Sequence, residues 1–326
     1  MDIIRRGIVT LLVGNFVATR QLRAQSFTKT PRIGFLWMGS EPDGLFESFR
    51  QALRGLGYEE GVSVAFVHRY GRTSRERLIA QAGELARLDL DVIVAAGAPS
   101  AVVARSATTQ VPIVFLVVGD PVATGLVASL ARPGGNLTGV AVATPEQAEK
   151  RLALLTQAAP EASRIAVLWN PDDRQTNREL DATKALATRQ GLQIQPLEVR
   201  SAGEFAHAFE EATRERAAAM SIITTPFIVL NQRRLAELAL KHRLPAIFWD
   251  GAFARLGGLM AFGPSERDIA MRTATAVSKV LKGARPGELP VEQPTRNELV
   301  INLNTARALR LNIPKALVAQ ADVVIG

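Results

Sequence analysis

The stretch from residue 113 to residue 140 reads IVFLVVGDPVATGLVASLARPGGNLTGV, and the order of its residue types indicates an α/β fold. An unbroken apolar run ends at Gly119-Asp120-Pro121, and residues 123–131 then have the composition of a short helix. Residues 132–136, RPGGN, end that helix, and a second apolar run follows. Continuous apolar strands separated by helices are typical of parallel sheets that are covered on both faces. We therefore expect a buried parallel strand with Asp120 at its carboxyl end.

The same order of elements occurs twice along the chain. RIGFLW at 32–37 and RIAVLW at 164–169 are nearly identical apolar strands, and each is followed by a loop and a helical pattern. This repeat predicts two similar lobes, each a doubly wound parallel sheet with helices on both faces. Later landmarks correspond as well: DVIVAAGAPS (91–100) with MSIITTPFIV (220–229), and VPIVFLVVGD (111–120) with LPAIFWDG (244–251).

Composition limits the chemistry of the chain. Its 326 residues favour two domains over one, and the absence of cysteine excludes disulfides and thiolate metal sites. The histidines His68, His207 and His242 are far apart and lack the spacing of metal ligands, so we predict neither a metal nor a cofactor. The formal net charge is +8, but the basic residues are scattered, so nucleic acid is not an expected partner.

Residues 1–24 have the pattern of a cleaved signal peptide. Arg5-Arg6 precedes an apolar stretch from Gly7 to Ala18, and Ala24 supplies a small residue for cleavage. The stretch is shorter than the roughly 20 apolar residues that span a bilayer. We expect export to the periplasm and removal of residues 1–24. The alternative is an amphipathic helix with no role in targeting.

Five stretches carry a family resemblance: GLGYEEGVSVAFVHR, DVIVAAGAPSA, GDPVATGLVASLARPGGNLTGV, RIAVLWNP and LPVEQPTRNELVINLNTARALRLNIP. They resemble the substrate-binding proteins of ABC importers in the periplasmic-binding-protein type I superfamily, especially members that bind aromatic amino acids. The resemblance implies a Venus-flytrap fold, in which a three-segment hinge joins two lobes that hold a solute between them. Residues 30–143 and 257–290 would form the N-terminal lobe, and residues 144–256 and 291–326 the C-terminal lobe.

Ligands of open parallel sheets bind outside the carboxyl ends of the strands, and the strand ends of two facing lobes share one cleft. Counting strand ends therefore predicts the ligand-binding residues. In the first lobe they are Met38, Gly39, Ser40, Gly97, Ala98, Pro99, Ser100, Gly119, Asp120 and Pro121, and in the second lobe Asn170, Pro171, Thr224, Thr225, Phe227, Trp249, Asp250 and Phe253.

Some of these candidates have a specific expected role. Ser100 begins a predicted helix, whose free N–H groups suit a ligand carboxylate, although Ser100 is equally suited to a purely structural N-cap. Asp250 or Asp120 is placed to accept an ammonium group, and Asp120 alternatively caps the helix that follows it.

Hydroxyl and aromatic groups complete the predicted site. Ser40 or Thr225 offers a hydroxyl, and Trp249 and Phe253 are the expected aromatic walls. The other two tryptophans, Trp37 and Trp169, occupy equivalent positions in the repeat and are predicted to be core residues.

The predicted function is capture of a small solute, an amino acid or small carboxylate, by closure of the two lobes. The resemblance implies delivery to an ABC permease in the inner membrane, and we expect the protein to be a monomer. No nucleophile elbow, P-loop or dinucleotide fingerprint is present, so we do not expect an enzyme. Two alternatives are a stand-alone sensor for a membrane receptor and an α/β enzyme without a recognisable motif.

Overall fold

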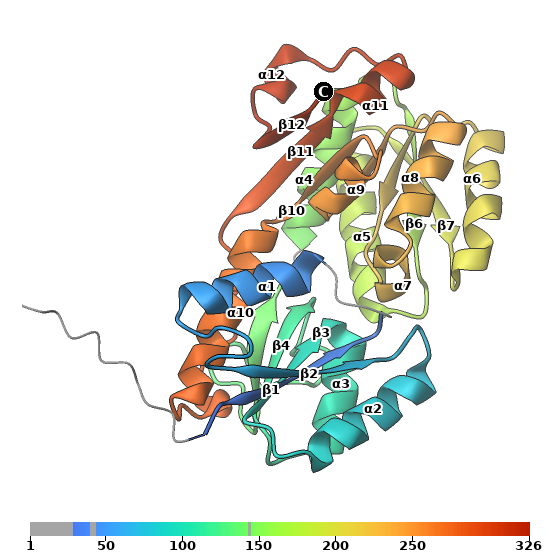
Figure 1. Cartoon of the computed structure of the whole chain (residues 1–326). Helices are drawn as coiled ribbons and strands as arrows, with labels where there is room; N and C mark the ends of the chain where they lie inside the picture. The colour runs from blue at the N-terminus through green and yellow to red at the C-terminus, as the bar shows by residue number, and fades with distance from the viewer. Residues whose placement is uncertain (1–28, 40–43, 143–144) are drawn as a thin grey trace, which may run out of the picture.

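The computed structural model describes residues 29–39, 44–142 and 145–326 and shows two α/β lobes stacked one on the other (Figure 1). Each lobe contains one largely parallel sheet with helices packed against it. The predicted signal peptide, residues 1–24, and Ser40 lie outside the described residues. Within the described ranges, no helix is both long and apolar enough to cross a membrane.

The first lobe has a five-stranded sheet in the order β2-β1-β3-β4-β5, and all neighbouring strands are parallel. The expected strand 32–37 forms as β1, because its continuous apolar run suits a central strand that is buried on both faces. The elements are β1 (Arg32–Trp37), α1 (Gly44–Gly55), β2 (Ala65–Tyr70), α2 (Arg75–Arg87), β3 (Val92–Ala96), α3 (Gly97–Ala107), β4 (Ile113–Val118) and β5 (Leu137–Ala141).

The second sheet repeats this order. Its strands run β7-β6-β8-β9-β10, position by position the order of the first sheet, and two further strands, β11 and β12, extend it. The prediction of two similar doubly wound lobes is therefore confirmed. The elements are α4 (Pro145–Ala158), β6 (Arg164–Trp169), α5 (Arg174–Arg189), β7 (Gln193–Glu198), η1 (Ala202–Glu204), α6 (Phe205–Arg214), β8 (Ala219–Ile222), α7 (Pro226–Val229), α8 (Gln232–Lys241), β9 (Ala246–Phe248), α9 (Gly251–Arg255), β10 (Met260–Pro264), α10 (Glu266–Leu281), η2 (Pro286–Glu288), β11 (Asn297–Asn302), α11 (Leu303–Ala308), α12 (Lys315–Val318) and β12 (Val323–Ile325).

Three segments join the lobes, as the fold requires. The chain crosses from lobe one to lobe two after β5 and returns to lobe one after β10. The third crossing leads from Glu292, which bridges to Val140 of lobe one, to β11 of lobe two. The first two crossings exchange a helix between the lobes. α4 follows the last strand of lobe one but packs on the sheet of lobe two, whereas α10 follows β10 of lobe two and packs on α1, β4 and β5.

The expected lobe boundary at residue 257 is wrong. From the sequence we expect residues 257–263 in the first lobe, but β10 pairs with β9 and β11 in the second sheet. The repeat explains this placement, since β10 is the fifth strand of lobe two just as β5 is the fifth strand of lobe one. The return to lobe one begins only with α10, and the final crossing follows Glu292 instead of residue 290.

The expected helix at residues 123–131 does not form. The chain there makes turns, with Thr124 N donating to Asp120 O at 3.1 Å and Gly125 N donating to Val122 O at 2.9 Å. Gly125 then has a φ of +69°, in the left-handed region where glycine is favoured, and this conformation ends the turn. Asp120 is consequently the cap of a turn and not of a helix.

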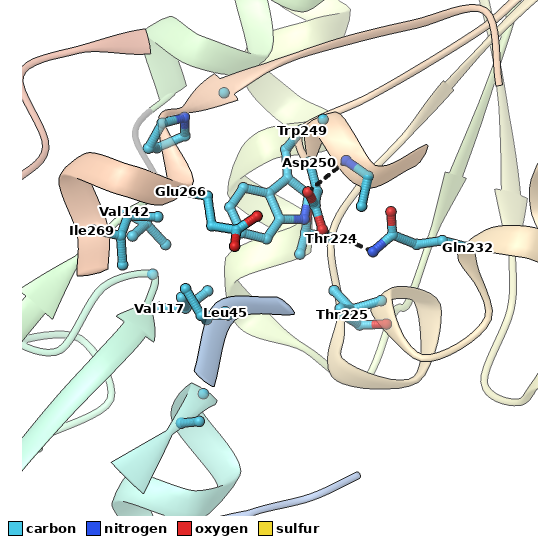
Figure 2. A pocket seen from close by; sticks show the side chains of 18 of the residues that line it. Leu45, Val117, Val142, Thr224, Thr225, Gln232, Trp249, Asp250, Glu266 and Ile269 are labelled. Carbon is cyan, nitrogen blue, oxygen red and sulfur yellow. Dashed lines mark hydrogen bonds between the residues drawn. The ribbon is translucent and has the colours of Figure 1, made fainter. Parts of the chain in front are cut away.

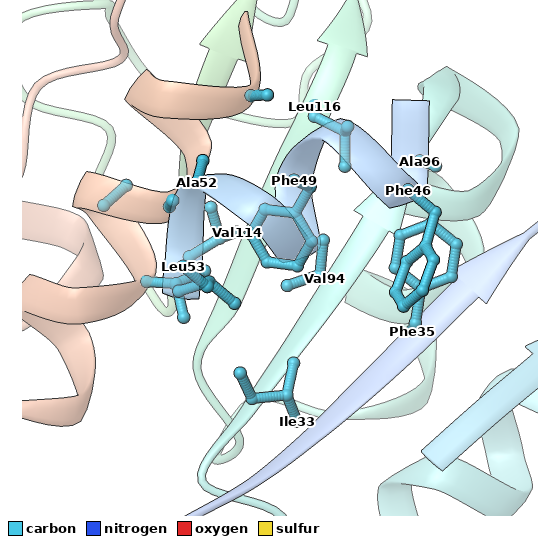
Figure 3. Close-up of a cluster of buried hydrophobic side chains, with 14 of the residues drawn as sticks. Ile33, Phe35, Phe46, Phe49, Ala52, Leu53, Val94, Ala96, Val114 and Leu116 are labelled. Atoms are coloured by element: carbon cyan, nitrogen blue, oxygen red, sulfur yellow. The ribbon is translucent and has the colours of Figure 1, made fainter. Parts of the chain in front are cut away.

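The core of lobe one shows how the helices are held on the sheet. Phe46, Phe49 and Leu53 recur at helical spacing on α1, and all three are buried against the strands (Figure 3). Ile33 of β1 and Val114 of β4 face them from the sheet. Burying each large side chain contributes about 1.5–3 kcal/mol, so this layer fixes the position of α1 beside the cleft.

Candidate ligand-binding site

A cavity of about 370 Å³ lies between the two lobes, where the parallel strands of both sheets end. This volume falls in the range of about 300–1,000 Å³ that is usual for small-molecule sites. Side chains from both lobes line it, so opening the lobes would divide the site into two halves (Figure 2). Seven residues predicted from the strand ends line the cavity: Gly97, Ala98, Gly119, Thr224, Thr225, Trp249 and Asp250.

Asp250 and Gln232 form the polar end of the cavity. Asp250 is the N-cap of α9, where its Oδ1 accepts from the backbone N–H of Ala252 at 2.9 Å. Its Oδ2 accepts from Gln232 Nε2 at 2.8 Å (Figure 2). Gln232 Oε1 and Thr224 Oγ1 are buried and have no partner among the described residues. Buried polar atoms are normally paired, so these oxygens are placed to bind a donor from a ligand.

The start of α3 supplies donors on the first lobe. The helix begins at Gly97, and its N-cap residue, Ala96, has no side chain that could satisfy the free N–H groups. Gly97 and Ala98 both line the cavity. Gly97 has a φ of +78°, and a Cβ there would lie 3.4 Å from Trp37. The first N–H groups of a helix and its positive dipole end favour an anion, which suits a ligand carboxylate.

An apolar pocket occupies the other part of the cavity. Leu45, Val117 and Ile269 of lobe one lie opposite the ring of Trp249 from lobe two (Figure 2). Trp249 Nε1 is buried and has no partner among the described residues. Trp37 is a buried core residue of lobe one, as predicted, and it also lines the cavity. An aromatic ring between these surfaces would be enclosed on both sides.

A buried ion pair forms part of the wall. Arg151 Nη2 of α4 donates to Glu179 Oε2 of α5 at 2.6 Å, and both side chains are almost fully buried. Burial lowers the pKa of the Arg151 guanidinium, and the negative charge of Glu179 opposes that shift. The pair therefore contributes one positive and one negative charge to the wall, and its net charge is zero.

Carboxylates outnumber guanidinium groups around the cavity. The second arginine, Arg255, lies 3.8 Å from a carboxylate oxygen of Glu298, so both arginines face acidic neighbours within the lining. Glu266 Oε1 accepts from Ser48 Oγ at 2.5 Å. The formal charge of the lining is thus negative in a chain whose total charge is +8. The acidic residues are Asp173, Glu179, Asp250, Glu266 and Glu298, and the basic residues are Arg151 and Arg255.

Comparison with known proteins identifies the family. The family model described as ABC transporter substrate binding protein matches residues 41–325. The chain belongs to this family. A curated relative, the tyrosine-binding protein of Clostridioides difficile (strain R20291), is 24% identical over 294 residues, which are 90% of this chain and 84% of that protein.

Solved structures show the same fold for this substrate-binding protein. The ABC domain in complex with L-Trp from Streptococcus pneumonia is 25% identical, with a TM-score of 0.84 over 91% of this chain and 100% of that chain. A conserved domain protein from Vibrio cholerae has a TM-score of 0.83 and is 25% identical over the same shares of the two chains. The predicted Venus-flytrap fold of type I periplasmic binding proteins is therefore confirmed.

Several predicted site residues lie outside the cavity of the substrate-binding protein. Phe253 was an expected wall, but it is fully buried in the core of lobe two, with its ring 5.7 Å from that of Phe248. Phe227 stacks on Phe205 at 5.8 Å. The residues that do not line the cavity are Met38, Gly39, Pro99, Ser100, Asp120, Pro121, Asn170, Pro171, Phe227 and Phe253.

Asp120 and Asn170 serve local structure in place of the expected contact, whereas Ser100 lies inside a helix and its Oγ has no partner among the described residues. Ser100 is fully buried in the fourth position of α3, because the helix begins three residues earlier than predicted. Asp120 Oδ1 accepts from the backbone N–H groups of Val122 and Ala123, and its Oδ2 pairs with Arg178 of lobe two. Asn170 Oδ1 accepts from the backbone N–H of Asp172 at 3.0 Å.

Most of the cavity wall was not predicted, including the polar side chains of Gln232 and Arg151. Gln232 and Arg151 lie in runs of polar residues on helices, NQRR at 231–234 and EKR at 149–151, where no local pattern indicates which side chain meets the cleft. Among the described residues, no three His, Cys, Asp or Glu side chains are grouped so that they could hold a metal ion.

Proposed function

We propose that this substrate-binding protein captures an aromatic amino acid between its lobes and delivers it to an ABC importer. The observation that carries this proposal is the position of the Asp250 carboxylate beside the ring of Trp249, with Gln232 hydrogen-bonded to that carboxylate and its Oε1 unpartnered among the described residues. An ammonium group bound there would make charge-assisted hydrogen bonds with both residues. The adjoining apolar pocket would hold the aromatic side chain.

The other end of an amino acid also has a suitable partner. Its carboxylate would accept from the N–H groups of Gly97 and Ala98 at the start of α3. The excess of carboxylates in the lining disfavours a ligand that is only an acid, because like charges in a confined site repel each other. A zwitterion is therefore favoured over the small carboxylate that the sequence left open.

The relatives support the same ligand class. The curated relative is a tyrosine-binding protein, and the structure from Streptococcus pneumonia holds L-Trp. Both are binding proteins, which points away from catalysis. In this proposal the ligand stabilises the closed lobes, because only in the closed form do Asp250 and the start of α3 contact it together.

Calorimetric titration of residues 25–326 tests the ligand class with matched compounds. We expect L-tryptophan or L-tyrosine to bind and indole-3-propionate, which lacks the ammonium group, to bind at least tenfold more weakly. If indole-3-propionate bound as tightly as the amino acids, the assignment of Asp250 and Gln232 as partners of the ammonium group would be contradicted. Lack of binding by every aromatic amino acid would contradict the proposed function.

A matched pair of variants tests Asp250 itself. Asp250→Asn keeps a side chain that caps α9 but removes the charge, so the Kd should rise about 30-fold, or about 2 kcal/mol. Asp172→Asn makes the same change at an exposed position outside the cavity and should leave the Kd unaltered. If Asp250→Asn bound the ligand with wild-type affinity, Asp250 would not be a ligand-binding residue.

We also infer that the protein works as a monomer in the periplasm after loss of residues 1–24. Expression of the full chain in a Gram-negative host, followed by osmotic shock and mass spectrometry of the released protein, tests the export and the cleavage. A product that stays in the cytoplasm with residues 1–24 intact would contradict the export step.

A further inference from the structure

The strand β4 changes its side-chain alternation just before it reaches the cavity. Ile113 and Phe115 point into the core under α2 and α3, while Val114 and Leu116 point into the opposite core under α1 and α10. A regular strand would return Val117 to the first of these cores. Val117 instead packs on the same side as Leu116, and Val118 takes the place expected for residue 117.

A one-residue bulge causes this change. Phe115 pairs with Gly139 of β5, but the next pair joins Val118 to Ala141, so β4 uses three steps where β5 uses two. Val117 has a φ of +56°, in the left-handed region. Glycine is the usual residue at such a position of a bulge, and a β-branched residue there is a strained outlier.

The neighbouring strand is adapted to this geometry. A Cβ at Gly139 would lie 2.1 Å from the carbonyl oxygen of Phe115, so only glycine permits β5 to approach β4 here. The bulge directs the half-buried Val117 side chain into the cavity beside Leu45 and opposite Trp249 (Figure 2). A strained backbone at a ligand site indicates a functional constraint on that residue.

We propose that Val117 is a specificity-determining residue, which limits the size of the aromatic ring that the cavity accepts. The proposal rests on the proposed function, since it concerns the pocket for the ring of the ligand. Glycine at 117 would relieve the backbone but would leave the pocket wider by an isopropyl group. We therefore attribute the presence of valine to the volume of its side chain, which narrows the pocket although the backbone at this position is strained.

Stability measurements test the strain. Val117→Gly removes the Cβ that makes this φ unfavourable, whereas Val117→Ala retains it. We expect the Gly variant to melt about 2 °C above the Ala variant. Val114 lies on the same face of β4 in a regular part of the strand, so Val114→Gly should melt below Val114→Ala. If the Gly variant melted above the Ala variant at both positions, or below it at both positions, the argument from strain would be overturned.

Binding measurements test the specificity. Val117→Ala should shift the ratio of the Kd values for L-phenylalanine and L-tryptophan at least threefold towards tryptophan, and Val117→Ile should weaken tryptophan at least tenfold. Val114→Ala removes the same atoms outside the cavity and should not change the ratio. An unchanged ratio in Val117→Ala, with wild-type binding intact, overturns only this proposal. Absence of wild-type binding to either amino acid overturns the proposed function and this proposal with it.

Discussion

Replacing Arg178 by glutamine should weaken ligand binding through a contact that lies outside the cavity. Arg178 of α5 in lobe two pairs with Asp120 of lobe one, and it is the only ion pair between the lobes among the described residues. The pair requires closed lobes, and the ligand also favours closed lobes, so the two are thermodynamically coupled. Both side chains are partly exposed, which limits the pair to about 0.2–1 kcal/mol. That range corresponds to a rise in Kd of about 1.4- to 5-fold.

The assay is calorimetric titration with L-tryptophan at low salt and again at about 1 M salt, where the Debye length of about 3 Å screens exposed pairs. Arg189→Gln is a matched control on the same helix. Its pair with Glu149 has exposures of 60% and 37%, against 56% and 37% for Arg178 and Asp120, but stays within lobe two. Equal Kd values for the two variants at low salt, or a difference that persists at high salt, would refute the coupling.

Two further predictions concern stability. Arg151→Met removes the guanidinium that pairs with the buried carboxylate of Glu179, so urea unfolding should show a loss of about 3–5 kcal/mol, and the double variant Arg151→Met/Glu179→Leu should recover most of it. Burial lowers the pKa of His68 from its usual 6.5, so the unfolded chain binds a proton that the folded chain excludes. The free energy of unfolding should therefore fall as the pH drops below about 6.5, and this dependence should be smaller in His68→Phe. If the melting temperatures of wild type and His68→Phe changed equally between pH 5 and pH 7, the prediction for His68 would be contradicted.

The two lobes could be predicted from the sequence because their strands are buried on both faces. RIGFLW and RIAVLW are apolar throughout, and a continuous apolar run depends only on burial. The same property explains the error at residues 257–263. An apolar run indicates that a strand is buried but not which sheet it joins, and this depends on pairing with β9 and β11.

The candidate site was partly predictable for a related reason. Topology places the strand ends at the cleft, so residues such as Thr224 and Asp250 could be located by counting strands. The direction of a side chain is a tertiary property. Phe253 has the same local pattern whether it enters the core or the cavity, and Gln232 is one of several consecutive polar residues at the start of a helix. The bulge at Val117 contradicts local preference, so no propensity could predict it.

The exchange of α4 and α10 between the lobes determines the order in which the chain can complete its cores during synthesis. All five strands of the first sheet have been made by residue 141, yet the helix that completes its second face ends only at Leu281. Until that helix emerges from the ribosome, apolar positions that Ala274 and Val277 will cover stay accessible to solvent. We therefore expect that a fragment ending after β5 does not fold on its own. An isolated first lobe would need α10 supplied by a redesigned connection from residue 141.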